Sequence, residues 1–307
     1  MTLTTEPHTA TPTAAPATPT TAAATGRAGL TALTALAPAV WGTTYLVTTE
    51  LLPPGHPLYA GLLRALPAGL LLLLVLRRLP EGVWWWRSLA LGALNIGIFF
   101  PLLFVAAERL PGGVAATVGA VQPLLVLALA LPLLGERPTA ARAGWAVAGV
   151  GGVALVVIGP DASVDPVGLL AGLGGALSMA AGVVLTRRWG RPDGVGSPVL
   201  VSWLLTAGGL VLLPATLLVE GAPPAIDVPA AGGYLWLGAV GGLAAYLLWF
   251  RGLGSLPVVA TALLGLLSPV VAAALGWLVL GEALRPLQLV GFALALAAIL
   301  GGQLTRR

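Results

Sequence analysis

The sequence predicts an all-α polytopic membrane protein in which ten transmembrane helices form two inverted five-helix repeats. Three observations predict this fold: the composition, a series of apolar runs, and an internal duplication. The chain has 307 residues, of which 58% are hydrophobic and 8% are charged, and its mean hydropathy is +0.97. Soluble domains carry about a quarter charged residues, so the composition indicates a protein that lies in a membrane.

The internal duplication covers the segment 91–136, which aligns without a gap on the segment 237–282. The two segments share 15 identities in 46 positions. Leu, Ala and Gly are abundant here and account for some of these by chance. The paired prolines, Pro123 and Pro269, and the paired Gly-Glu sequences that end in Glu136 and Glu282 are not explained in this way. The chain therefore contains two copies of one unit.

Residues 1–27 are rich in Thr, Ala and Pro, and we expect a disordered tail because so few large apolar side chains cannot offset the entropy of ordering. Ten apolar runs follow, each near the roughly 20 residues that span about 30 Å of hydrocarbon. In the first repeat, residues 28–160, we place spans at 33–51, 58–76, 88–107, 113–134 and 140–158. The second repeat and a short C-terminal tail, residues 161–307, have spans at 167–186, 198–219, 231–251, 258–280 and 286–304.

The orientation follows from the distribution of Arg, because cytoplasmic loops carry an excess of basic residues. With the N-terminus inside, twelve arginines face the cytoplasm, whereas only Arg109 and Arg285 face outward and Arg64 lies within the second span. Both termini are then cytoplasmic, and we expect the protein in the cell (inner) membrane. An odd number of spans per repeat makes the two repeats run in opposite directions, which is a structural basis of alternating access.

Four short stretches carry a family resemblance. They are Trp41-Gly42-Thr43-Thr44 in the first span, Leu63-Arg64 in the second, Pro123…Gly135-Glu136-Arg137, and Pro269…Gly281-Glu282-Ala283. The chain from about residue 30 to 303 resembles the drug/metabolite transporter superfamily, and within it the ten-helix EamA-type exporters. The resemblance implies a bundle with a central cavity, lined mainly by spans 1, 3, 4, 6, 8 and 9, and the export of small metabolites or amino acids.

The sequence departs from that family in the sixth span. There the family usually has a Trp after a Ser, whereas here Ser178 is followed by Met179. If that Trp shapes the cavity, we expect a softer wall here and a different substrate.

Arg64 is the most informative side chain, because a charge within a span is costly and must find partners. It could be a cationic anchor for a substrate carboxylate or phosphate. It could instead pair within the bundle, with Glu50 or with backbone carbonyls, and fix the hairpin of the first two spans.

Polar and aromatic residues supply the other candidates for a substrate cavity. The amides Asn95 and Gln122 bind either a substrate or a neighbouring helix, and Ser268 is the repeat equivalent of Gln122. The aromatic residues could line a pocket, or they could serve packing alone. The candidate cavity residues are Trp41, Thr44, Arg64, Asn95, Phe99, Gln122, Ser178, Tyr246, Trp249 and Ser268.

Four residues are predicted to shape the repeats. Pro123 and Pro269 predict a symmetric pair of kinks in spans 4 and 9. Glu136 and Glu282 end these spans, and we interpret them as structural corners. They remain candidates for proton transfer, as do Glu50 and Glu108, so protons are a candidate coupling ion.

The sequence also bounds the function. There is no cysteine, no glycine-rich phosphate loop and no intramembrane catalytic cluster, so we expect no metal, no cofactor and no enzymatic activity. The basic residues are scattered one to three at a time between apolar runs, so we expect no nucleic-acid partner. We expect a secondary active transporter that exports a small metabolite or amino acid across the lipid bilayer by alternating access. A lipid-linked or nucleotide-sugar carrier, an importer, and a membrane scaffold or sensor without transport remain alternatives. The oligomeric state is not predicted.

Overall fold

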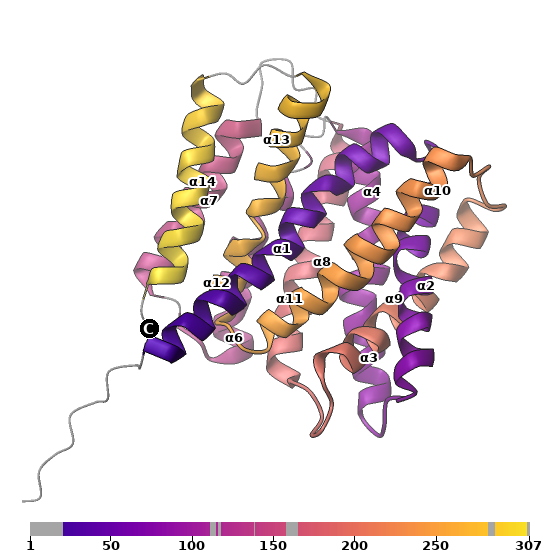
Figure 1. Ribbon diagram of the computed structural model, residues 1–307, viewed down its shortest axis with the longest axis horizontal. Helices are drawn as coiled ribbons and strands as arrows, with labels where there is room; N and C mark the ends of the chain where they lie inside the picture. Colours follow the sequence, from indigo (N-terminus) through magenta and orange to yellow (C-terminus); the bar gives the residue numbers. More distant parts are fainter. Residues whose placement is uncertain are drawn as a thin grey trace, which may run out of the picture.

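The computed structural model describes residues 21–110, 115, 118–137, 139–157, 165–281 and 286–305, and every regular element within these ranges is helical. The elements are listed here in chain order: α1 (Thr21–Leu51), α2 (Pro57–Leu76), α3 (Trp84–Gly92), η1 (Ala93–Gly97), α4 (Phe99–Arg109), α6 (Gln122–Leu134), α7 (Ala140–Val157), α8 (Pro166–Trp189), α9 (Ser197–Val219), α10 (Val228–Leu235), η2 (Trp236–Ala244), α11 (Ala245–Leu253), α12 (Val258–Leu264), α13 (Leu267–Leu280) and α14 (Pro286–Leu304). They form a single bundle, with α7 and α14 at one edge and α2 and α9 at the other (Figure 1).

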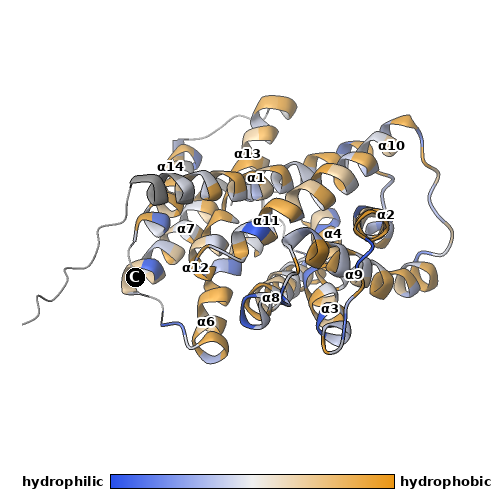
Figure 2. Cartoon of the chain, turned by 60° about the horizontal axis from the view of Figure 1, so that its bottom comes forward, coloured by the Kyte–Doolittle hydropathy of each residue, from blue (hydrophilic) through white to orange (hydrophobic). Residues whose placement is uncertain are grey.

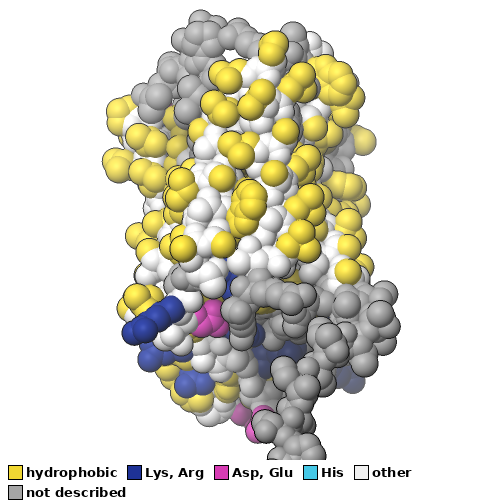
Figure 3. All heavy atoms as spheres, turned by 90° about the vertical axis from the view of Figure 1, so that its left-hand side faces the viewer, with side chains coloured by type: hydrophobic (Ala, Val, Ile, Leu, Met, Phe, Trp, Pro, Cys, Tyr) yellow, Lys and Arg dark blue, Asp and Glu magenta, His cyan; other side chains and the backbone are white. Residues whose placement is uncertain are grey.

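The bundle has the surface of a polytopic membrane protein. Among the described residues, eight helices are long and apolar enough to cross a membrane, and two shorter apolar helices lie at Gln122–Leu134 and Ala140–Leu155. Apolar residues cover most of the helices, and the polar ones gather at helix ends and connections (Figure 2). On the face seen in Figure 3, hydrophobic side chains extend over most of the height and the charged ones lie near one end.

The first helix begins earlier than the sequence analysis expected. α1 starts at Thr21, so residues 21–27, which we assigned to the disordered tail, continue the helix. Three consecutive alanines follow Thr21, and Ala has the highest helix propensity, so these residues extend the first membrane helix at little cost. Residues 1–20 lie outside the described residues.

Spans 4 and 9 are each interrupted by a short turn ahead of a proline. Residues 120 and 121 form a turn and α6 starts at Gln122, while residues 265 and 266 form a turn between α12 and α13. Pro123 and Pro269 each follow the turn closely. A proline cannot donate to the preceding turn and clashes with it, but it fits the first turn of a new helix. Backbone hydrogen bonds continue through both turns, for example from the Leu124 amide to Val121 and from the Ser268 amide to Gly265.

Spans 3 and 8 contain π-helical segments at equivalent positions of the duplication. η1 covers Ala93–Gly97, and a shift of 146 residues places these positions on residues 239–243, within η2. A π-helical segment adds a residue to the turn and disturbs the regular backbone hydrogen bonds, so that carbonyl groups become available to side chains. The sequence analysis did not predict these segments.

The helices pack between the repeats in a symmetric pattern. α1 contacts α11 and α13 of the second repeat, and α8, its counterpart, contacts α4 and α6 of the first. The second spans of the two repeats, α2 and α9, pack together, and so do the fifth spans, α7 and α14. Glycine permits the closest approaches: a Cβ on Gly69 of α2 would lie 2.5 Å from the backbone nitrogen of Thr206 in α9.

Connections at one end of the bundle are joined by arginines. Arg78 donates from Nη1 to the carbonyl of Gly194 at 2.7 Å, and Arg187 donates from Nη1 to the carbonyl of Gly254 at 3.1 Å. These hydrogen bonds join the connections that follow α2, α8 and α11.

Connections at the other end are joined by carboxylates. Glu220 accepts from the amides of Leu58 and Tyr59 at 2.6 and 2.9 Å. Asp165 forms an ion pair with Arg109 at 3.5 Å. The connections that precede α2 and follow α9, and the end of α4 and start of α8, therefore lie at this second end.

Candidate functional site

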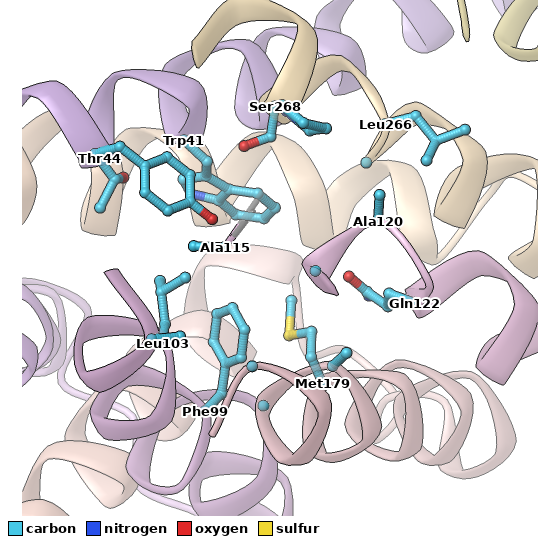
Figure 4. Close-up of a pocket in the computed structure, with 18 of the residues that line it drawn as sticks. Trp41, Thr44, Phe99, Leu103, Ala115, Ala120, Gln122, Met179, Leu266 and Ser268 are labelled. Atoms are coloured by element: carbon cyan, nitrogen blue, oxygen red, sulfur yellow. The ribbon is translucent and has the colours of Figure 1, made fainter. Parts of the chain in front are cut away.

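A cavity of about 100 Å³ lies where α1, α4, α6, α8, α11 and α13 meet. These are the spans that the family resemblance implied, and Arg64 joins them from α2. Figure 4 shows Trp41 and Ser268 on one side of the cavity and Phe99 and Met179 on the other, with Gln122 between them. The candidate residues that line it are Trp41, Thr44, Arg64, Phe99, Gln122, Tyr246, Trp249 and Ser268, and Pro123 and Pro269 line it as well.

Arg64 is buried in the wall of this cavity, with 2% of its surface exposed. Its Nη1 donates to Oγ1 of Thr44 and its Nη2 to the carbonyl of Gly241, both at 3.3 Å, and its Cζ lies 4.7 Å from the centre of the Phe100 ring. Its Nε has no hydrogen-bond partner. Glu50, the partner considered in the sequence analysis, is exposed, so a backbone carbonyl and a hydroxyl hold the guanidinium instead.

Aromatic rings from two helices form one wall. Trp41 of α1 lies 5.4 Å from Tyr246 and 5.2 Å from Trp249 of α11, centre to centre. The Nε1 of Trp41 donates to the Gly241 carbonyl at 2.9 Å. Trp249 is 1% exposed, and its Nε1 has no partner. The wall thus combines apolar faces with one unused donor.

The starts of two helices border the cavity. Gln122 belongs to the first turn of α6 and Ser268 to the first turn of α13. Backbone hydrogen bonds across the preceding turns, such as those of the Leu124 and Ser268 amides with the carbonyls of Val121 and Gly265, already occupy part of the donors of these first turns. The first-repeat and second-repeat residues occupy equivalent positions of the duplication, so the two repeats contribute matching parts of the wall.

Two candidate residues lie outside the cavity lining. Asn95 is fully buried in η1, and its Nδ2 donates to the Leu91 carbonyl of the preceding turn at 2.8 Å. It therefore reaches neither a substrate cavity nor a polar group on another helix. Ser178 points to the neighbouring span, where its Oγ donates to the Leu94 carbonyl at 2.7 Å. Both side chains bond to backbone around the π-helical segment.

Sequence reasoning missed most of the small and aliphatic lining residues. Leu103, Ala176 and Leu266 line the cavity, but nothing in their type separates them from the many other Leu and Ala residues. Met179 could be found, since it stands where the family usually has Trp, and it lines the cavity with 2% exposure.

Glu136 and Glu282, the predicted structural corners, each follow a glycine that ends a helix. Gly135 and Gly281 end α6 and α13 in the left-handed conformation, with φ of 68° and 69°, which favours glycine at a helix C-terminus. Glu136 follows the first of them and is half-buried, whereas Glu282 lies outside the described residues. Within the described ranges, no group of three or more His, Cys, Asp or Glu side chains could hold a metal ion.

This fold and site define a class: a polytopic helical membrane protein with an internal cavity at the junction of two similar halves. The comparisons identify the family. The profile of the EamA-like transporter family matches residues 29–158 and again residues 166–301. The chain belongs to the EamA-like transporter family.

Known relatives and a solved structure agree with this assignment. The chain is 47% identical over 264 residues to Protein PecM of Dickeya dadantii, which covers 86% of this chain and 89% of that protein. It is 29% identical over 269 residues to an uncharacterized inner membrane transporter, YedA, of Escherichia coli K12, over 85% of this chain and 86% of that protein. A crystal structure superposes with a TM-score of 0.75 at 19% identity, covering 91% of this chain and 97% of the other, which shows a shared fold.

Proposed function

We propose that this protein is a secondary active transporter that exports a small metabolite across the inner membrane by alternating access. The single observation that carries this proposal is the cavity with a buried cation, Arg64, between two similar halves. A bundle packed only with Leu and Ala would favour the scaffold alternative. The transporter relatives favour transport, and the cavity supplies a place where a solute could bind.

Two observations support ten spans in an inverted arrangement. Contacts between the repeats are paired, as α1 with α13 and α8 with α6, which a two-fold axis in the membrane plane would generate. The connections also contact one another in two groups. Arg78 and Arg187 form hydrogen bonds between connections at one end, which we assign to the cytoplasm. Glu220 and Asp165 form a hydrogen bond and an ion pair at the other end.

The broken helices support alternating access around the cavity. Many transporters bind solutes where discontinuous helices meet near the middle of the membrane. Here the starts of α6 and α13 border the cavity. The π-helical segments η1 and η2 hold lining residues, because the Asn95 and Gly241 carbonyls accept hydrogen bonds from Tyr246 and Arg64. Such segments can change backbone hydrogen bonding without unfolding a span, so we expect them to move when the halves exchange conformations.

The lipid-carrier alternative has less support. A separate, open apolar pocket of about 440 Å³ lies between α2 and η2, with Leu63, Pro67 and Gly238 among its lining residues. It shares no lining residue with the central cavity, so it does not provide a lipid path to Arg64.

The experiment compares efflux of a metabolite panel from cells with and without the chain, followed by transport in proteoliposomes. We expect Arg64→Ala to reduce transport at least about tenfold while the protein still inserts, because the removed cation is the main polar group of the cavity. Arg188→Ala is the matched control, since Arg188 is exposed. A protonophore arm tests protons as the coupling ion. Unchanged transport by Arg64→Ala would contradict the proposed site.

A further inference from the structure

The polar atoms left without partners around the cavity are donors. Arg64 and Trp249 both line the cavity, and Arg64 Nε and Trp249 Nε1 are buried without a hydrogen-bond partner. Unsatisfied buried donors are costly, and a native structure usually explains them by a ligand, a water or an ion. Two donors at one cavity call for an acceptor-rich ligand.

Arg64 is also held weakly. Its two contacts, with the Thr44 hydroxyl and the Gly241 carbonyl, are 3.3 Å long. A guanidinium with a carboxylate makes bonds of about 2.7–2.9 Å, which are roughly twice as strong as bonds between neutral groups. The two neutral oxygens therefore occupy positions that a carboxylate would fill better.

Within the described residues, no Asp or Glu lines the cavity. A zwitterion would place its ammonium group in a cavity that already holds the Arg64 cation, with no carboxylate of the protein to pair that ammonium. A monoanion neutralises Arg64 and leaves no charge unpaired, which is what a buried site requires.

We propose that the cavity binds a small organic monoanion with a flat, unsaturated body, whose carboxylate replaces the Thr44 hydroxyl and the Gly241 carbonyl at Arg64. This inference rests on the proposed transport function and names its substrate class. The flat body lies against Trp41, Tyr246 and Trp249, whose faces and edges attract an aromatic ring. The volume of about 100 Å³ is below the roughly 150 Å³ of an apolar cavity that holds benzene, so the cavity takes a body of one ring at most.

The test measures binding to the purified full chain in detergent by calorimetry, with probes that differ in one property each. Benzoate is a flat monoanion, benzamide is its neutral isostere, phenylalanine is a zwitterion, and cyclohexanecarboxylate is an anion without a flat ring. We expect benzoate to bind at least about tenfold more tightly than benzamide or phenylalanine, and more tightly than cyclohexanecarboxylate.

Variants locate the binding site. Arg64→Gln should remove the preference for benzoate over benzamide, and Arg64→Lys should keep part of that preference. Trp249→Phe retains an aromatic ring but removes the indole donor, so it should weaken the binding of benzoate. Arg188→Gln is the control and should bind like the natural chain. Arg64→Lys keeps the test valid if Arg64→Gln impairs folding.

Three results would overturn the inference: equal binding of benzoate and benzamide, tighter binding of phenylalanine, or no binding of any probe. A preference for benzoate that persists in folded Arg64→Gln would overturn it too. Failure of the transport proposal looks different. In that case benzoate binds as expected, but proteoliposomes move neither benzoate nor any solute of the metabolite panel.

Discussion

At the scale of the residue, Arg64 explains both what the sequence predicts and what it leaves open. A charged residue within an apolar run must have polar partners, so its position in the cavity could be predicted. Its partners could not. The Gly241 carbonyl becomes available through a π-helical segment about 180 residues away, and no residue type encodes that. The exposed Glu50 was a reasonable candidate from sequence and is not a partner.

Gly42 has a role at the same scale. A Cβ on Gly42 of α1 would lie 2.6 Å from the backbone carbonyl oxygen of Ser268 in α13. The absence of a side chain therefore lets the two helices meet beside the cavity. Trp41 thus lines the cavity, and the adjacent Gly42 makes the close contact between α1 and α13.

We expect Gly42→Ala to push α13 and Ser268 away from α1, and to cost about 1–3 kcal/mol of stability as overpacking does. Transport should fall more than the amount of folded protein, because the cavity wall moves. Gly29→Ala in the same helix is the control, since its Cβ would meet nothing within 4 Å. Thermal melting and proteoliposome flux measure both effects; equal behaviour of the two variants would refute this role.

At the scale of the element, the π-helical segments are linked across the repeats by equivalent carbonyls. Asn95 in η1 accepts a hydrogen bond from the Tyr246 hydroxyl at 3.1 Å, and Gly241 in η2 accepts one from Trp41 Nε1 at 2.9 Å. Positions 95 and 241 are equivalent in the duplication. Each repeat thus places an aromatic donor on the irregular backbone of the other.

Tyr246→Phe removes one of these links and retains the ring. We expect a modest loss of stability, about 1 kcal/mol, but a change in transport rate of severalfold, because in the proposed mechanism the link joins parts that move relative to each other. Tyr59→Phe removes a similar hydrogen bond to Gly221, made at 2.7 Å near the end of the bundle, and should leave the rate unchanged. Equal rates for both variants would show that η1 needs no such link.

Asp165 stabilises the start of α8. Its Oδ1 accepts from the Gly168 amide at 2.8 Å. The Gly168 amide, with smaller contributions from the Val167 amide and the Arg109 guanidinium, holds the pKa of Asp165 below its usual range. The ionised form is therefore favoured in the folded state. Its stabilisation is present above the ordinary Asp pKa and is lost as the pH falls through the lowered value.

We expect Asp165→Ala to lower the melting temperature at neutral pH, and the difference from the natural chain to shrink as the pH falls below about 4. The measurement is a series of melting curves in detergent between neutral and acidic pH. Asp193→Ala is the control, because Asp193 is exposed and caps no helix. A difference that stays constant with pH would contradict the charged cap.

The approximate positions of the apolar helices could be predicted because hydrocarbon thickness fixes the length of an apolar run. Among the described residues eight helices are long and apolar enough to cross a membrane, and the number of ten spans stays a prediction. The breaks at residues 120–121 and 265–266 could be predicted only as kinks, since a proline permits both outcomes. The π-helical segments could not be predicted, because one extra residue per turn leaves hydropathy unchanged. Eight of the ten candidate residues line the cavity, and Asn95 and Ser178 bond to backbone instead.

At the scale of the whole molecule, the helices that are equivalent in the sequence duplication also make equivalent packing contacts. The repeats exchange contacts through α1 and α8, and they meet at α2–α9 and α7–α14. The cavity lies where the exchanged helices cross. In the proposed alternating-access mechanism, a relative movement of the halves would open it to one side as it closes it to the other, and Arg64 would serve both open states.

The most direct test of this account uses the absence of natural cysteine. Ser268→Cys places one thiol in the cavity wall with little change in size, and membrane-impermeant thiol reagents then probe it from each side of sealed vesicles. The account predicts labelling from both sides, with the ratio between sides changing when substrate is added. Labelling from one side only, under every condition in which transport is measured, would contradict it.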